Sequence, residues 1–144
     1  MTKIQNRVKE LTEEQGTAEP ENICENMGII VLSLDLPERV NGFTMKQNGI
    51  WFIVLNNMLN DDQKRFTTAH ELGHIILHGC TNSINLSCNT GFCVSRYERE
   101  ADLFAAYLLL QAEYDQYVDY ETLTLNQVSQ ITHIPQSKVD KLFF

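Results

Sequence analysis

The sequence predicts an α+β fold in which a small β-sheet packs against helices, and three observations lead to this prediction. Three strand-like segments lie between residues 29 and 56, and helix-like segments flank them on both sides. Two of the strands are joined by Asn48-Gly49, which favours a tight hairpin turn because both residues tolerate positive φ. The next segment contains His70-Glu71-Leu72-Gly73-His74 within a helical pattern. We expect a single domain over residues 1–144, long enough to bury a core.

Two N-terminal helices are expected within residues 1–28. From about Lys3 to Glu14 the chain is charged, with apolar residues at spacings of three and four, and Gly16 closes this helix. The first helix should therefore bury only one face. A second, short helix is expected from Pro20, which suits the first turn of a helix, to Gly28.

The sheet is expected within residues 29–56. The run from Ile29 to Leu34 is rich in β-branched residues and is followed by Pro37, which indicates a buried strand. Segments 42–47 and 50–55 flank the Asn48-Gly49 turn and predict a hairpin. Together these segments predict one sheet of three strands.

Residues 60–112 are expected to form two helices and the loop between them. Asn60 or Asp61 can cap a helix that contains the histidine motif and runs to about Gly79. Apolar residues fall on several faces of this helix, so we expect it to be covered nearly all round. Polar side chains on so apolar a helix need partners, and a metal ion would supply them.

The chain after this helix changes in composition. Residues 80–94 are mostly small or polar, which predicts a long loop that forms a lid or a substrate rim. A further helix is expected to begin near Ser95 and to run through Leu110. Residues 113–144 predict two short helices that pack back as a C-terminal tail.

The histidine motif has the spacing of a metal site. Residues four apart on an α-helix lie about 40° apart around its axis, so His70 and His74 can present their imidazoles to one cation. Two imidazoles and one carboxylate leave a position open for water, and Glu71 beside the pair can accept a proton from that water. The pattern therefore indicates a zinc hydrolase. The competing interpretations are chance and two histidines that are hydrogen-bonded within a core.

The third zinc ligand must come from another segment, and the helix near Ser95 offers the best candidate. Glu98 and Asp102 are four residues apart, so they share a face, and alanines on the same side allow this helix to approach the histidine helix closely. Glu98 as the ligand, with Asp102 accepting a ring N–H from His70 or His74, is a coherent arrangement.

Alternatives to this ligand set stay open from the sequence. Ser95 and Glu98 also match a capping box, in which Glu98 would only satisfy backbone donors at the helix start. His78 lies one turn beyond His74 and can be a ligand or a hydrogen-bonded structural histidine. Further candidates for the third ligand are Glu100, Asp102 or a cysteine, and a site without a third protein ligand is also open.

The four cysteines do not predict disulfides. The chain shows no export signal, so a reducing compartment and free thiols are expected for Cys24, Cys80, Cys88 and Cys93. The last three lie in or near the predicted loop, but their spacing matches no zinc knuckle. A second metal site, or a structural site closed by one of these cysteines, is the alternative.

The charge and hydropathy of the chain exclude several classes of function. The net charge is −8, and the 11 basic residues are spread along the chain, which argues against direct nucleic-acid binding. The longest apolar runs are far shorter than a membrane span, and the first residues lack the apolar region of a signal peptide. We expect a soluble, cytoplasmic protein without a membrane partner.

Two motifs together resemble a known family. The segment RFTTAHELGHIILH, followed by YEREADLFAAYLLL, resembles the ImmA/IrrE family of small cytosolic zinc metallopeptidases, and the tail TLNQVSQITHIPQSKV is similar to that family's short helical tail. The resemblance implies a minimal gluzincin-like zincin core, with a small antiparallel sheet beside the histidine helix and a second helix that bears the glutamate ligand. Many relatives continue with L-L-M-P where this chain has Leu110-Gln111-Ala112, which leaves the end of the second helix open.

The resemblance also implies roles for individual residues. His70 and His74 match the zinc ligands of the family, Glu71 matches the general base, Glu98 the third ligand and Asp102 the supporting acid. Zn²⁺ is the implied cofactor. Members of the family are associated with site-specific cleavage of helix-turn-helix repressors, so the implied protein partner is such a repressor, whose cleavage relieves repression. A zinc-binding regulator that binds a repressor without proteolysis is the alternative.

Overall fold

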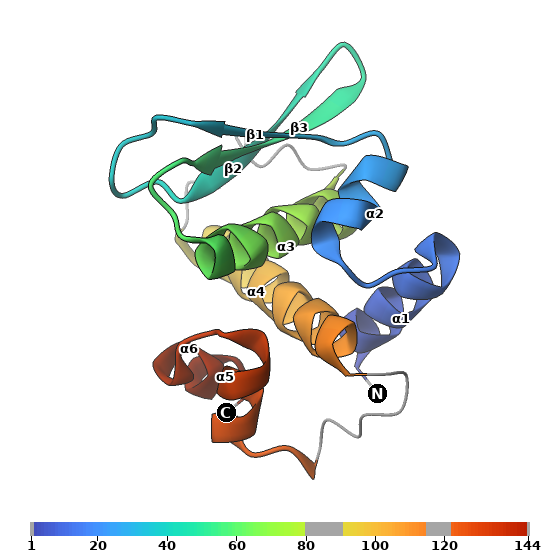
Figure 1. The fold of residues 1–144 in the computed structure, drawn as a ribbon, viewed down its shortest axis with the longest axis vertical. Coiled ribbons are helices and arrows are strands. Elements are labelled where there is room, and N and C mark those ends of the chain that lie inside the picture. The colour runs from blue at the N-terminus through green and yellow to red at the C-terminus, as the bar shows by residue number, and fades with distance from the viewer. Residues whose placement is uncertain (1, 80–90, 115–121, 144) are drawn as a thin grey trace.

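A computed structural model of the chain describes residues 2–79, 91–114 and 122–143, with their side chains except those of 91–95 and 143. It confirms the α+β class, because a three-stranded sheet lies over α3, and α3 in turn packs on α4 (Figure 1). The elements are α1 (Lys3–Gln15), α2 (Pro20–Asn26), β1 (Ile30–Leu34), β2 (Gly42–Gln47), β3 (Ile50–Asn56), α3 (Asp61–His78), α4 (Gly91–Glu113), α5 (Leu125–Thr132) and α6 (Gln136–Phe143).

The sheet is mixed, so the expectation of an antiparallel sheet is wrong for one of its two strand pairs. The strand order is β1-β3-β2, in which β2 and β3 form the predicted antiparallel hairpin and β1 runs parallel to β3. The physical reason is that β3 is the most apolar strand and takes the central place, where Ile53, Val54 and Leu55 are buried. The chain from β1 must therefore cross to the far edge before it enters the hairpin.

The connection between β1 and β2 is held by one side chain at the end of β3. The side-chain amide of Asn56 donates to the carbonyl oxygens of Leu36, Pro37 and Val40 at 3.3, 3.2 and 3.0 Å. The strand β1 itself lies at the edge of the sheet, and all of its residues except Val31 are exposed. The prediction of a wholly buried strand is therefore wrong, although Ile29 just before β1 is buried.

The helix α3 begins as the sequence predicts, whereas α4 begins earlier. Asn60 caps α3 through a capping box with Gln63, in which the two side chains accept from each other's backbone N–H at 2.8 and 2.9 Å. The helix α4 starts at Gly91, so the last residues of the predicted loop are helical and Ser95 lies inside the helix. A capping box at Ser95 is thereby excluded. The helix continues to Glu113, and no proline interrupts its last turn.

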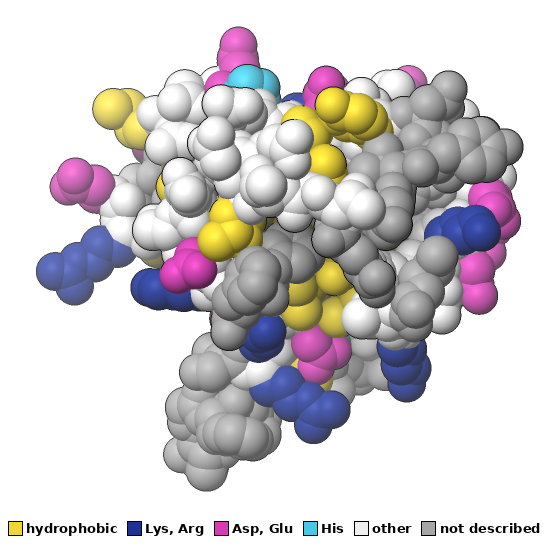
Figure 2. Space-filling model, turned by 90° about the horizontal axis from the view of Figure 1, so that it is seen from below, with side chains coloured by type: hydrophobic (Ala, Val, Ile, Leu, Met, Phe, Trp, Pro, Cys, Tyr) yellow, Lys and Arg dark blue, Asp and Glu magenta, His cyan; other side chains and the backbone are white. Residues whose placement is uncertain are grey.

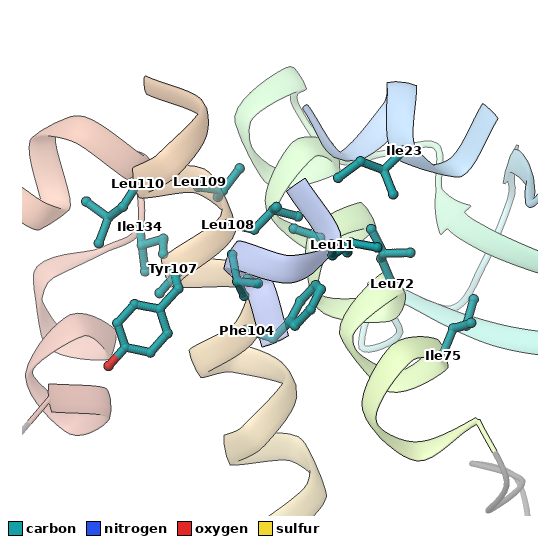
Figure 3. Close-up of a cluster of buried hydrophobic side chains, with 14 of the residues drawn as sticks. Leu11, Ile23, Leu72, Ile75, Phe104, Tyr107, Leu108, Leu109, Leu110 and Ile134 are labelled. Carbon is teal, nitrogen blue, oxygen red and sulfur yellow. The ribbon is translucent and has the colours of Figure 1, made fainter. Parts of the chain in front are cut away.

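The helix α4 passes through the centre of the hydrophobic core (Figure 3). Its segment 104–110 is buried along its whole length, with Phe104 facing α3, and α4 also contacts α1, α5 and α6. Gly73 of α3 lies against Phe104: a Cβ atom at Gly73 would lie 3.0 to 3.1 Å from three carbon atoms of that side chain. The absence of a side chain at Gly73 therefore sets how closely α3 and α4 approach.

The C-terminal helices α5 and α6 pack on α4, as the sequence predicts for the tail. Arg99 of α4 donates from its guanidinium group to the carbonyl oxygens of Lys141 and Leu142 at 2.7 and 3.0 Å, near the end of α6. Three residues join α5 to α6, and the first of them, His133, has a φ of 60°. The two short helices are thus held to the helix that also carries Glu98.

The surface carries charges of both signs. Figure 2 shows acidic and basic side chains interspersed on the face of the molecule seen from below. Within residues 2–79, 91–114 and 122–143, no helix has the length and apolar character needed to span a membrane.

The contact between Gly73 and Phe104 generates a prediction about stability. In an exposed helix, replacing glycine by alanine stabilises by about 1 kcal/mol, but crowding of a packed core costs roughly 1–3 kcal/mol. We expect Gly73→Ala to lower the free energy of unfolding, as measured by urea denaturation, because the new Cβ meets Phe104. In a Phe104→Leu background the same change should cost less. A stabilising effect of Gly73→Ala in the wild-type background would contradict this packing argument.

Candidate metal centre

The helices α3 and α4 bring together three side chains that the sequence selects as metal ligands. His70 and His74 project from α3 and Glu98 from α4, and one ligand atom from each lies within 4.8 Å of the others. Nε2 of His70 lies 3.0 Å from Oε2 of Glu98, and Nε2 of His74 lies 2.9 Å from Oε1. Both imidazoles therefore face the same carboxylate with the same ring atom.

The three groups differ in exposure in a way that suits a site open on one side. The side chain of His74 is 5% exposed and that of His70 12%, whereas the side chain of Glu98 is 48% exposed. The histidines are thus fixed in the protein interior. The carboxylate of Glu98 lies where solvent can reach it.

Asp102 lies one turn beyond Glu98 on α4 and contacts the other side of the His70 ring. Its Oδ1 is 2.7 Å from Nδ1 of His70, and Nζ of Lys138 in α6 is 3.5 Å from the same oxygen. The sequence left open which histidine Asp102 would contact, and the structure places it at His70. A carboxylate at Nδ1 fixes both the orientation and the tautomer of a ligating imidazole.

The chemistry of these donors fits a bound cation. When Asp102 holds a proton on Nδ1 of His70, the neutral ring has a lone pair at Nε2, and this lone pair faces the carboxylate of Glu98 at 3.0 Å. Two acceptors at that distance repel each other unless a second proton or a metal ion lies between them. Two imidazole nitrogens and one carboxylate oxygen are the donor set of catalytic zinc sites with an open position.

The titration behaviour of the metal-free groups follows from the same geometry. Burial lowers the pKa of His70, but hydrogen bonds to Asp102 and Glu98 outweigh burial and raise it to about 9. Hydrogen bonds from His70 and His74 hold the pKa of Glu98 well below its usual range. In the absence of metal, a second proton on His70 therefore takes the place of the cation.

Glu71 lies in the same neighbourhood but in a different environment. It is buried on α3, and burial raises the pKa of its carboxyl group, while the charges of His70 and His74 oppose the rise. The helical spacing turns Glu71 away from its neighbour His70, and it is absent from the group of ligand atoms. A buried carboxylate with a raised pKa is suited to accept and return a proton.

The alternatives that the sequence left open are placed elsewhere. Nδ1 of His78 lies 3.2 Å from Nδ1 of His74, on the side of that ring that faces away from Glu98. Glu100 lies 3.5 Å from His78 and not in the ligand group, which within the described residues consists of His70, His74 and Glu98.

The predicted lid and three cysteines are not tested by the structure. Residues 80–90, with Cys80 and Cys88, lie outside the described residues, and so does the side chain of Cys93. Sequence reasoning missed the contact of Lys138 with Asp102, and it considered Glu100 only as a metal ligand and not as a neighbour of His78. A pattern of residue types does not reveal contacts between distant segments, so no signal in the sequence could have indicated Lys138.

Comparisons with known proteins identify the family. A model of the IrrE N-terminal-like domain, which defines peptidase family M78, matches residues 24–125. The chain belongs to this family. The match includes α3 and α4, and hence every candidate ligand of this M78 protein.

Two relatives cover much of the chain. "Uncharacterized immunity region protein 2" of Bacillus phage phi105 is 32% identical over 135 residues, which are 93% of this chain and 85% of that protein. "Metallopeptidase ImmA" of Bacillus subtilis (strain 168) is 31% identical over 109 residues, 74% of this chain but only 63% of ImmA. The chain thus spans less than two thirds of ImmA. No solved structure matches.

The raised pKa of His70 predicts that metal binding releases a proton. At pH 7 the metal-free ring carries two protons, since its pKa is about 9. Binding of Zn²⁺ should therefore release about one proton from this ring, and affinity should rise with pH until the ring is neutral. Calorimetry in buffers of different ionisation enthalpy measures the release.

Asp102→Asn is the matched control for this experiment. It keeps the size of the side chain but removes the charge that raises the pKa, so the release at pH 7 should fall. Equal proton release by the wild type and Asp102→Asn would show that Asp102 does not set the protonation of His70.

The described ligand set also predicts that the metal does not need a cysteine. Replacing Cys80, Cys88 and Cys93 by serine should leave one equivalent of bound metal, measured by elemental analysis of purified protein. Cys24 is then the one remaining thiol, and burial raises its pKa to about 12, with a smaller contribution from Glu21. It should react with a thiol reagent only after denaturation. Loss of the metal in the triple variant would instead indicate a cysteine ligand.

Proposed function

We propose that this M78 protein is a zinc-dependent endopeptidase that cleaves a helix-turn-helix transcriptional repressor and so relieves repression. The observation that supports it most is the convergence of His70, His74 and Glu98 beside the buried Glu71. Membership of a metallopeptidase family adds weight to hydrolysis over simple metal storage. In this proposal His70, His74 and Glu98 hold Zn²⁺.

Each residue has a defined task in the proposed reaction. When bound, Zn²⁺ supplies Lewis-acid chemistry, which polarises a carbonyl group and lowers the pKa of water. The carboxylate of Glu71 accepts a proton from the attacking water and later transfers it to the nitrogen of the leaving amine. Asp102 holds the ring of His70 through Nδ1, so that Nε2 stays directed towards the ion.

The proposal of a repressor as substrate has two supports. One relative bears the name of an immunity region protein of a phage, and the other the name ImmA. The net charge of −8 also suits a basic partner, because complementary charge speeds association, and DNA-binding repressors carry basic surfaces. We propose that both proteins meet in the cytoplasm, where the repressor acts. An edge strand of the sheet can hold an extended segment of the repressor by β-augmentation.

The decisive experiment uses Glu71→Gln. We expect this variant to bind Zn²⁺ like the wild type but to cleave the cognate repressor roughly 10² to 10⁴ times more slowly, which is the usual contribution of a general base. The candidate substrate is a helix-turn-helix repressor sought among the proteins encoded near this one. Its cleavage is measured by electrophoresis and mass spectrometry, with and without a chelator. Glu25→Gln is the matched control, because Glu25 is an exposed residue of α2 and should leave cleavage unchanged.

The same variants separate proteolysis from binding. If Glu71→Gln still lifts repression in cells, the protein acts by binding the repressor and the proposed peptidase activity is wrong. An intact repressor after incubation with the zinc-loaded wild type would also count against the proposal.

A further inference from the structure

The third histidine of α3 is buried directly behind one of the candidate ligands. The side chain of His78 is 4% exposed, and its Nδ1 lies 3.2 Å from Nδ1 of His74. Its Nε2 points towards α4, where Oε2 of Glu100 lies at 3.5 Å. The ring of Tyr97, also on α4, packs against the His78 ring with a centroid distance of 4.4 Å. His78 therefore sits between His74 and the surface of α4.

We propose that His78 is a positioning residue for His74: it accepts the Nδ1–H of His74 and thereby keeps the Nε2 lone pair of His74 available to the metal ion. The inference rests on the proposed function only in taking His74 as a metal ligand. In this inference His78, supported by Glu100, orients the ring of His74, just as Asp102 orients the ring of His70.

The direction of the hydrogen bond follows from the two described polar neighbours of His78, which are His74 and Glu100. Two Nδ1 atoms at 3.2 Å attract each other only if one carries a hydrogen and the other a lone pair. The carboxylate of Glu100 can only accept, so it favours the hydrogen of His78 on Nε2 and leaves a lone pair on Nδ1. The hydrogen between the two rings therefore belongs to His74.

The consequence for His74 is a fixed tautomer. A neutral imidazole has one N–H, and when this is at Nδ1 the atom that faces Glu98 and the metal position is an unprotonated Nε2. The opposite tautomer would place a hydrogen on Nε2 and prevent ligation.

Glu100 is itself held in place by its own helix. Nε of Arg96 donates to Oε1 of Glu100 at 3.2 Å, one turn earlier on α4. Because Arg96 uses Oε1, the other oxygen of the carboxylate is left to face His78. The polar contacts thus run from Arg96 through Glu100 and His78 to His74, and they cross from α4 to α3 in the interior.

The test replaces His78 by phenylalanine and by glutamine. Phenylalanine keeps an aromatic ring against Tyr97 but removes the acceptor, whereas the side-chain carbonyl of glutamine can restore an acceptor. We expect His78→Phe to lower the affinity for Zn²⁺ by about 10 to 100-fold, the usual effect of losing a partner of a metal-binding histidine. His78→Gln should lose less. Competition with a chromophoric chelator measures both affinities.

A second measurement reads the hydrogen bond directly in the zinc-loaded protein. Nitrogen-15 NMR of the histidine side chains should show the hydrogen of His74 on Nδ1, protected from solvent exchange by His78 in the wild type and exchanging faster in His78→Phe. A purely structural role of His78 would lower thermal stability without changing this exchange. Unchanged zinc affinity and an unchanged exchange rate of the His74 Nδ1–H in His78→Phe would overturn the inference.

These readouts are independent of peptide cleavage. If the wild type binds Zn²⁺ and His78→Phe shows the expected changes, but no repressor is cut, only the proposed function fails. If the repressor is cut and His78→Phe behaves like the wild type, only the role of His78 fails.

Discussion

The close approach of α3 and α4 is the contact on which the rest of the structure depends. The two helices meet where Gly73, which lies between His70 and His74 on α3, leaves room for Phe104 of α4. The ring of Phe104 packs directly against the backbone of α3 at Gly73. Because a packed interior leaves no space for adjustment, this contact fixes both the distance between the two helices and their rotation about their axes. Within the described residues, the geometry of the candidate metal centre is therefore set by two helices and the core between them.

The sequence predicted those parts of the fold that depend on local chemistry. Asn48-Gly49 specified the hairpin and Asn60 specified the start of α3, since turns and caps are decided by a few neighbouring residues. The parallel pairing of β1 and the start of α4 at Gly91 were predicted wrongly. Strand order depends on which strand gains most from burial on both faces, and a helix start without a strong cap leaves no clear local signal.

In the candidate site, too, the features that depend on neighbouring residues were predictable and those that depend on distant segments were not. Spacing on one helix brought His70 and His74 together, and a shared helical face selected Glu98 with Asp102, so all four positions could be proposed before any coordinates were known. The surroundings could not be predicted, because Lys138 reaches Asp102 from a helix far along the chain. The two histidines also differ in their partners: Nδ1 of His70 faces the carboxylate of Asp102, whereas Nδ1 of His74 faces the ring of His78. The motif itself, in which the two histidines look equivalent, does not predict this difference.

The contacts of α6 with α4 have a practical consequence for anyone who handles this protein. Arg99 binds the carbonyl oxygens near the end of α6, and Lys138 of the same helix contacts the carboxylate behind His70. The helix α6 is thus held to α4, the helix that carries the candidate ligand Glu98. A purification tag fused at the C-terminal end, or a truncation before α6, would disturb the metal centre from a distance, and a tag is better placed before α1.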